Sequence, residues 1–403
     1  MERSLRSARV ANFVYFVLCG TLMGTWVVHI PAIEERVGIS HATLGSLLVL
    51  LGLGAFTGMQ IAGRLADRLG ARVVLPVAGV LSSTAAVLPG LPHDPWMLAG
   101  ALLVFGFCNG CLDVSMNAHA VHVEKAYNRP VMSAFHAMFS VGGVIASLVG
   151  AGAASAGMSP AAGMGAVGIV GIVTALASAH GLLPTAPTSA ATATATATAE
   201  GEGTPAGKRR SAPGRIWVLA ALALMVMLSE GAANDWSALH LKDILGAPAS
   251  TAAVGYGTYA AAMTTGRLLA DRVSGRFGPI AVLRHGAVTA AVGITIVAVS
   301  PWIWAAFAGW ALFGLGLSGC VPQLFSAAGR ADPSAAGANV SRVAGLGYLG
   351  MLSGPAVIGW LTHLVALNHA LLLLTLLCAI AAAAAGVLRT GSDRTREVAR
   401  SSH

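Results

Sequence analysis

Long apolar runs constrain this chain more than any other feature of its sequence. Runs of about 20 mostly apolar residues recur along nearly its whole length, and a helix of that length crosses a hydrocarbon core of roughly 30 Å. Charged residues make up 10% of the chain, against about 25% in ordinary globular domains. The 403 residues accommodate a dozen such helices with short connections. The sequence therefore predicts an all-α, multi-pass membrane protein without a soluble domain.

The predicted spans form two sets of six. They cover residues 8–30, 41–62, 73–91, 96–121, 131–153 and 159–183, then 216–239, 251–270, 280–299, 302–326, 339–363 and 367–388. Between the sets lies the tract TATATATA followed by GEGTPAGKRR, which has too little apolar surface to offset the entropy of ordering. We expect an N-terminal bundle at 1–183, a flexible linker at 184–214, a C-terminal bundle at 215–390 and a tail at 391–403.

Basic residues fall on one side of this topology. Of the 24 Lys and Arg residues, only Arg36 and Lys242 are assigned to the far side. Positively charged connections stay in the cytoplasm, so both termini and the linker are expected there. The net charge of +8 then reports orientation, and a nucleic-acid partner is not expected.

The five cysteines all fall within apolar runs, so a disulfide framework is not indicated. Cys108 and Cys111 form a CxxC motif, which is found in redox and metal sites. This one lies within a predicted span and has no second pair, which favours a packing role. We expect no metal site and no cofactor.

The two sets of spans share sequence motifs. GRLADRLG at 63–70 follows the second span, and GRLLADR at 266–272 follows the eighth. Gly110 and Cys111 in the fourth span are repeated as Gly319 and Cys320 in the tenth. A duplicated six-helix unit is typical of transporters that hold the substrate between two halves near the membrane midplane.

The repeated motif, the two sets of six spans and the central linker together resemble the major facilitator superfamily over nearly the whole chain. The acid of the fourth span, SEGAANDW at 229–236 and GYLGMLSGP at 347–355 resemble a bacterial inner-membrane group named YbjJ, which is similar to the fucose permease branch of sugar and proton symporters. The resemblance implies two pseudo-symmetric six-helix bundles in a bacterial cytoplasmic membrane. It also implies a cytoplasmic gate formed by Gly63, Arg64, Asp67, Arg68, Gly70, Arg72, Asp271 and Arg272.

In that family the acid and arginine of this motif hold the cytoplasmic side shut in the outward-open state. The resemblance implies this latch for Asp67 and Arg68. A solvated loop, whose arginines only enforce topology, is the alternative.

Carboxylates inside the spans are scarce, and Asp113 and Glu230 are the two expected to be buried. A charged residue at the centre of a span costs about 2.5–3.5 kcal/mol on insertion scales, so such residues usually mark ion or substrate pathways. Asp113 and His136, on neighbouring spans, could meet as a proton relay, because histidine titrates near neutrality. A static hydrogen bond between the two spans is the alternative. We expect Asp113, His136 and Glu230 to carry proton coupling.

Neutral and aromatic residues complete the expected substrate cavity. The candidates are Asn117, one helical turn beyond Asp113, together with Asn234, Asp235, Trp26, Gln323 and Asn339. Fucose-type symporters carry an acid in the first span, which is absent here. Drug antiporters carry a Gly-Pro pair in the fifth span, which is also absent.

These features predict a proton-coupled secondary transporter for a small polar organic solute, monomeric and working by alternating access. A proton-driven exporter of amphipathic compounds is the alternative, and a membrane sensor without transport is a third hypothesis. An enzyme is not expected.

Overall fold

The computed structural model describes residues 2–127, 131–183, 214–331 and 336–389, so nearly all of the predicted linker and the predicted tail fall outside the described residues. The first half comprises α1 (Glu2–Val37), α2 (His41–Leu69), α3 (Ala71–Ala85), η1 (Leu88–Gly90), α4 (Pro95–Tyr127), α5 (Met132–Ser155) and α6 (Pro160–Ala179). The second comprises α8 (Gly214–Leu239), η2 (His240–Ile244), α9 (Ala249–Phe277), α10 (Pro279–Val299), α11 (Ile303–Leu317), α12 (Cys320–Ala331), α13 (Ala336–Leu361), α14 (Leu367–Ala370), α15 (Leu372–Ala383) and η4 (Ala384–Leu388). The described residues form helices joined by short connections and contain no strand, as predicted.

Eleven helical segments of the described chain are long and apolar enough to cross a membrane. The remaining predicted span, the eighth at 251–270, corresponds to α9, which is not among the eleven. Glycine, serine, threonine and tyrosine lower the mean hydropathy of α9. The helix packs against both α5 and α11, so protein and not only lipid surrounds it. The model thus agrees with the predicted twelve-span architecture.

The packing repeats between the halves. α1 packs on α5 and α2 on α4, while α8 packs on α13 and α9 on α11. A single glycine separates α2 from α3 and α9 from α10: Gly70 has φ +84° and Gly278 has φ +82°. Both conformations favour a residue without a Cβ. The second and third long helices of each half are therefore joined by the same sharp turn.

Close contact between α2 and α4 depends on paired glycines. Gly54 and Gly58 on α2 face Gly106 and Gly110 on α4, and a Cβ at any of the four would collide with backbone of the opposite helix. Such small-xxx-small spacing lets membrane helices approach closely.

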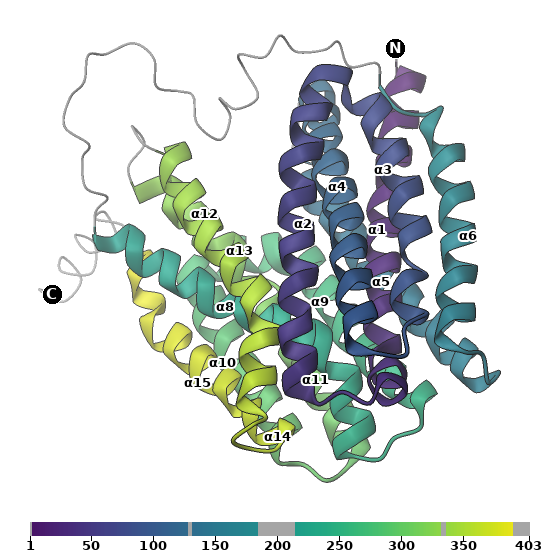
Figure 1. Cartoon of the computed structure of the whole chain (residues 1–403). Coiled ribbons are helices and arrows are strands. Elements are labelled where there is room, and N and C mark those ends of the chain that lie inside the picture. The colour runs from purple at the N-terminus through teal and green to yellow at the C-terminus, as the bar shows by residue number, and fades with distance from the viewer. Residues whose placement is uncertain (1, 128–130, 184–213, 332–335, 390–403) are drawn as a thin grey trace, which may run out of the picture.

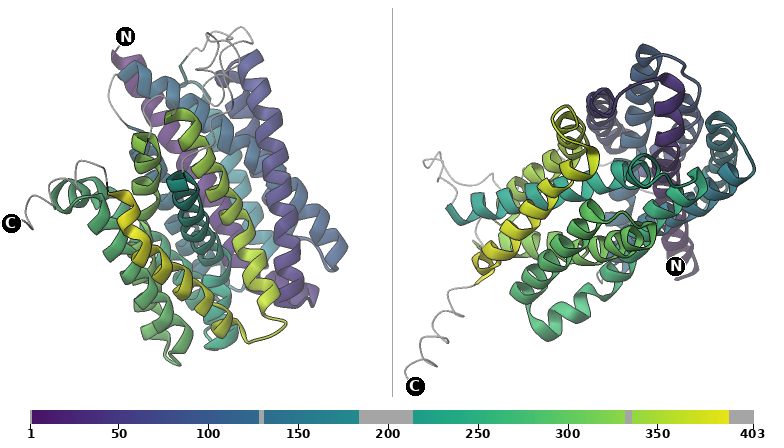
Figure 2. Two further views of the ribbon diagram at one scale, coloured as in Figure 1. Left: turned by 90° about the vertical axis from the view of Figure 1, so that its left-hand side faces the viewer. Right: turned by 90° about the horizontal axis from the view of Figure 1, so that it is seen from below.

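The two halves meet toward the end of the molecule that is drawn lowest. Figure 1 shows the halves leaning apart toward the upper end, where the N-terminus and the α2–α3 turn lie, and Figure 2 shows them from two further sides. α2 packs on α13, and α5 packs on α9. Ser46 near the start of α2 accepts a hydrogen bond from Trp360 near the end of α13, and Ser147 donates to the Ala253 carbonyl. The contacts thus come from the lower part of each helix.

Two helix ends differ from the predicted spans. α1 continues through Pro31 to Val37, seven residues past the predicted end, so Glu34 and Glu35 are helical. α8 continues into the π-helical turn η2, which carries Lys242 and Asp243. Both extensions carry charges that the sequence pattern assigned to loops.

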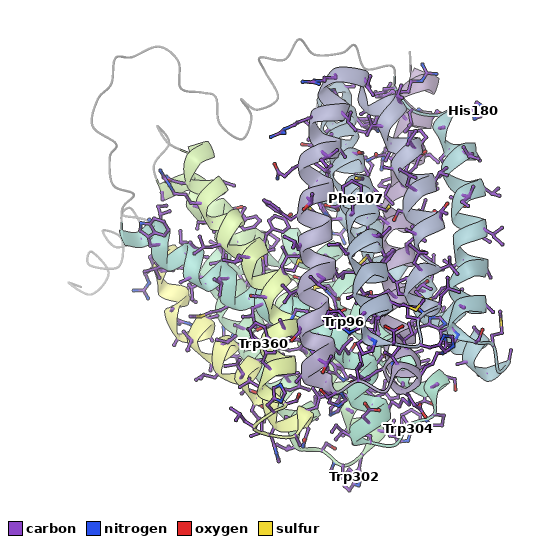
Figure 3. The ribbon with its side chains drawn as sticks, viewed as in Figure 1. Trp96, Phe107, His180, Trp302, Trp304 and Trp360 are labelled. Carbon is purple, nitrogen blue, oxygen red and sulfur yellow. The ribbon has the colours of Figure 1, made fainter. Side chains whose placement is uncertain are left out.

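An amphipathic tryptophan ring near the end of a span commonly lies at the membrane interface. Trp96, Trp302 and Trp360 are more than half exposed, and Figure 3 shows them toward the lower end. Trp26 and Trp236 are fully buried, so interfacial anchoring is wrong for these two. The indole of Trp236 instead donates a hydrogen bond to the Pro355 carbonyl at 3.0 Å, joining α8 to α13.

Candidate functional site

A charged pair lies inside the molecule where the two halves meet. Arg267 of α9 donates a hydrogen bond of 2.6 Å to Glu230 of α8 and one of 3.2 Å to the Ser140 hydroxyl of α5 in the other half. The side chains of Arg267 and Glu230 are 26% and 12% exposed. Because removing one partner leaves the other as an uncompensated buried charge, each residue depends on the other.

The sequence analysis did not identify Arg267 as a central residue. In the repeated motif Arg267 is the counterpart of Arg64. Arg64 lies five residues before the end of α2 and is exposed, whereas Arg267 lies ten residues before the end of α9 and reaches inward. A signal was present, because a buried acid in the seventh span needs a cation, and Arg267 lies within the predicted eighth span.

Asp113 of α4 contacts Asn117 one turn further along. The Asn117 amide donates to the Asp113 carboxylate at 3.3 Å and to its backbone carbonyl at 2.9 Å. Among the described residues no cation pairs with Asp113, in contrast to Glu230. A partly buried carboxylate with a neutral partner is chemically suited to taking up a proton.

His136 does not meet Asp113 in this structure, and no hydrogen bond or ion pair between them is described. The imidazole instead packs edge-on against Phe16 of α1, with ring centroids 5.3 Å apart. Its charged neighbours are Arg267 and Glu230. The reason is that α5 packs on α1 and α9, which turns His136 toward the centre of the molecule. The expected proton-coupling residues thus divide into Asp113 with Asn117, and Glu230 with His136.

Three further cavity candidates lie between the halves. Trp26 of α1 is fully buried, and its indole N–H lies near the Asp235 carboxyl of α8 without completing a hydrogen bond. Asp235 is buried and Asn234 partly buried. Trp26 has no exposed surface with which to touch a solute in this conformation.

Gln323 and Asn339 are engaged within the second half. Gln323 accepts a hydrogen bond of 3.2 Å from Ser274, which joins α12 to α9. Asn339 accepts one of 3.0 Å from Arg342, and its amide nitrogen is buried without a partner. In this conformation both residues are positioned by their own bundle.

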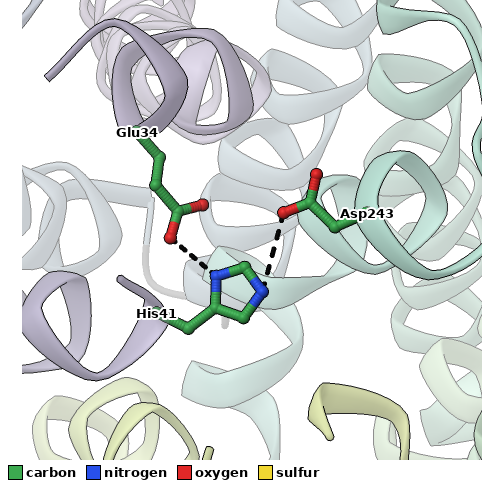
Figure 4. Close-up of side chains that lie close together, drawn as sticks. All are labelled: Glu34, His41 and Asp243. Carbon is green, nitrogen blue, oxygen red and sulfur yellow. Dashed lines mark hydrogen bonds and ion pairs between the residues drawn. The ribbon is translucent and has the colours of Figure 1, made fainter. Parts of the chain in front are cut away.

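A second charged cluster closes the lower end, and the sequence reasoning did not single it out. His41 at the start of α2 lies between Glu34 of α1 and Asp243 of η2, at 2.6 Å and 3.6 Å (Figure 4). Lys242 donates to Glu35 at 2.5 Å and to the Pro31 carbonyl at 3.1 Å. Asp243 and Lys242 belong to one half and their partners to the other, so these contacts hold the halves together.

The sequence matches a known family. The model of the Major Facilitator Superfamily matches residues 11–328, most of the chain. The chain belongs to the Major Facilitator Superfamily.

Relatives and solved structures of the superfamily agree with this assignment. An uncharacterised MFS-type transporter of Yersinia pestis is 36% identical over 95% of this chain and 96% of its own length. An uncharacterised transporter of Sinorhizobium fredii is also 36% identical, over 93% and 96%. The nucleoside transporter NupG has the same fold, with a TM-score of 0.75, 12% identity and coverage of 95% of this chain and all of that chain. A bacterial homologue of the lysosomal transporter Spinster, in an inward-facing conformation, also scores 0.75, at 17% identity over 96% and 97%. The chain is therefore a membrane transporter and not an enzyme.

The gate motif of this facilitator lies at the upper end. Arg64, Arg68, Arg72 and Arg272 are exposed, and Gly63 has open space around it. No ion pair between these arginines and the opposite half is described. The side chains of Asp67 and Asp271 lie outside the described residues, so the latch stays a prediction.

The five cysteines of the facilitator are free and buried. Cys111 donates a weak hydrogen bond to the Gly58 carbonyl of α2. This contact accords with a packing role for the CxxC motif.

Proposed function

We propose that this chain is a proton-coupled secondary transporter of a small polar organic solute, of the YbjJ type near the fucose permease branch. In this proposal the lower end faces the outside of a bacterial cytoplasmic membrane and is closed, while the upper end faces the cytoplasm. Arg36 and Lys242, the two basic residues predicted outside, both lie at the lower end, which supports this orientation.

The observation that carries the proposal is the contact of Arg267 with Glu230 and Ser140. It puts one cation and one anion at the junction of the halves, inside a protein whose spans are otherwise almost free of charge. Intramembrane ion pairs at such a position usually serve ion or substrate passage, since an apolar contact would join the helices at lower cost.

Proton coupling follows from the chemistry of the pair. Protonation of Glu230 would remove its charge and free the Arg267 guanidinium to bind an anionic or hydroxyl-rich solute. His136 beside the pair and Asp113 with Asn117 are the further groups through which a proton would pass. Once the halves move, the solute cavity would be completed by the neutral candidates Asn234, Gln323 and Asn339, together with Asp235 and Trp26.

Export of amphipathic compounds is the second candidate. A chloramphenicol resistance protein of Streptomyces lividans is 34% identical over 128 residues, which are 30% of this chain. This partial similarity supports testing drugs beside sugars, organic acids and nucleosides.

Counterflow in proteoliposomes tests the proposal. A solute chosen by thermal-shift screening should exchange across the membrane, and Arg267→Gln should abolish exchange while Arg284→Gln, at an exposed arginine on α10, should not. Asp113→Asn should keep counterflow but lose uphill accumulation driven by an imposed proton gradient. Depletion instead of accumulation under an inward proton gradient would identify an exporter. Unchanged accumulation by both the Asp113→Asn and Glu230→Gln variants would contradict proton coupling through these acids.

A further inference from the structure

The cluster of Glu34, His41 and Asp243 at the lower end brings together three metal-ligating side chains. Each offers one ligand atom, and these atoms lie within 4.8 Å of one another. They come from α1, α2 and η2, so two belong to the first half and one to the second (Figure 4). We propose that these three residues form a divalent transition-metal site, suited to Zn²⁺, that clamps the two halves together.

The ligand set matches the chemistry of zinc. Zn²⁺ binds imidazole nitrogen and carboxylate oxygen at about 2.0–2.2 Å, and sites with three protein ligands and an open position are common. His41 Nδ1 and Glu34 Oε1 are joined by a hydrogen bond of 2.6 Å, and a metal ion would take the place of the proton between them. Oε2, the second oxygen of Glu34, has no described hydrogen bond and can serve as a ligand without breaking one. In this structure Nδ1 of His41 faces Glu34 and Nε2 faces Asp243, so the Asp243 side chain must move to the Nδ1 side of the ring for all three residues to bind one ion.

Access and charge also favour a cation. A cavity of about 620 Å³ is lined by all three residues and by Glu35 and Lys242. His41 and Asp243 are 24% and 29% exposed, whereas Glu34 is 7% exposed and forms the floor. The Lys242 ammonium is held by Glu35 and the Pro31 carbonyl. Glu34 and Asp243 are then paired with His41 alone, and a divalent ion would supply the positive charge in place of the His41 proton.

A metal held by all three residues requires the lower end to be closed, because Asp243 moves with the second half. Zn²⁺ should therefore raise the population of the conformation described here. This effect rests on the alternating access proposed above, whereas binding itself does not.

Calorimetric titration of the purified, chelator-treated chain with ZnCl₂ tests the site. We expect one ion per chain, and binding weakened by more than about tenfold in His41→Gln and Asp243→Asn. His93→Gln, at an exposed histidine of the lower end, is the matched control and should bind like the wild type. Asp243→Asn changes a partly exposed group and should fold even if variants of buried Glu34 do not. Absence of binding, or equal binding by wild type and both ligand variants, would overturn the site.

The clamp has a separate readout. Ser147→Cys places a thiol under α9 at the junction of the halves, where alkylation requires them to part. Zn²⁺ should slow that alkylation in the wild-type background and leave it unchanged with His41→Gln. Binding without slower alkylation would overturn the clamp and leave the metal site in place. If the protein binds Zn²⁺ but shows no counterflow, the metal site stands and the proposed transport is contradicted.

Discussion

At the scale of single residues, Arg267 and Glu230 should depend on each other energetically. Each single substitution, Arg267→Met or Glu230→Gln, leaves one charge without its partner, whereas the double substitution removes both. We expect a coupling free energy of about 1–3 kcal/mol, at the lower end of what fully buried pairs show because Arg267 is partly exposed. Thermal unfolding of the four proteins in detergent measures it.

Additive effects of the two substitutions would contradict this coupling. Ser140→Ala is a useful control, because it removes one hydrogen bond from the Arg267 guanidinium but no charge, and should cost about 1.5–3 kcal/mol.

The same residues show what a sequence can reveal of a site. The contact of Asn117 with Asp113 was predictable, because residues four apart on a helix are always neighbours. The position of His136 was not, because it depends on α5 packing against α1 and α9. The pairing of Glu230 with Arg267 joins two predicted spans, and only their arrangement in space reveals it.

At the scale of helices, Gly45 of α2 and Gly359 of α13 should control closure of the lower end. A Cβ at position 45 would lie 2.9 Å from the Gly359 Cα, too close for real atoms. Overpacking typically costs about 1–3 kcal/mol, and 1.4 kcal/mol shifts an equilibrium tenfold. Gly45→Val should therefore increase the alkylation rate of Ser147→Cys about tenfold.

Gly152→Val on α5 is the matched control, since position 152 has open space around it. Equal alkylation rates in the two variants would mean that the α2–α13 contact does not hold the lower end closed.

Helix existence was largely predictable, because length and apolar character determine which segments span a membrane. The residues at which helices end were less predictable. The first span was predicted to end at Ile30, yet α1 continues to Val37 with Pro31 inside the helix. The span predicted at 302–326 is two helices, α11 and α12, separated at Ser318 and Gly319. Glu34 and Asp243 of the lower cluster lie on such extensions, which is why the sequence pattern overlooked the cluster.

At the scale of the whole molecule, the gate motif should act in the conformation opposite to this one. The arginines of the upper end are exposed here, and the resemblance to the family assigns them contacts when that end closes. Asp67→Asn should reduce transport several-fold while membrane insertion, measured by expression and thermal stability, stays normal. Normal transport by this variant would favour the solvated-loop alternative.

Alternating access predicts that closing one end of the transporter opens the other. Distances between paired spin labels measure this directly. The pair His93→Cys and His363→Cys spans the halves at the lower end, and the pair Leu69→Cys and Phe277→Cys spans them at the upper end. All four positions are exposed. The five native cysteines are buried and should stay unlabelled. With solute and an imposed pH change, we predict that the lower distance lengthens as the upper distance shortens. Two distances that stay fixed, or that change in the same direction, would contradict the account.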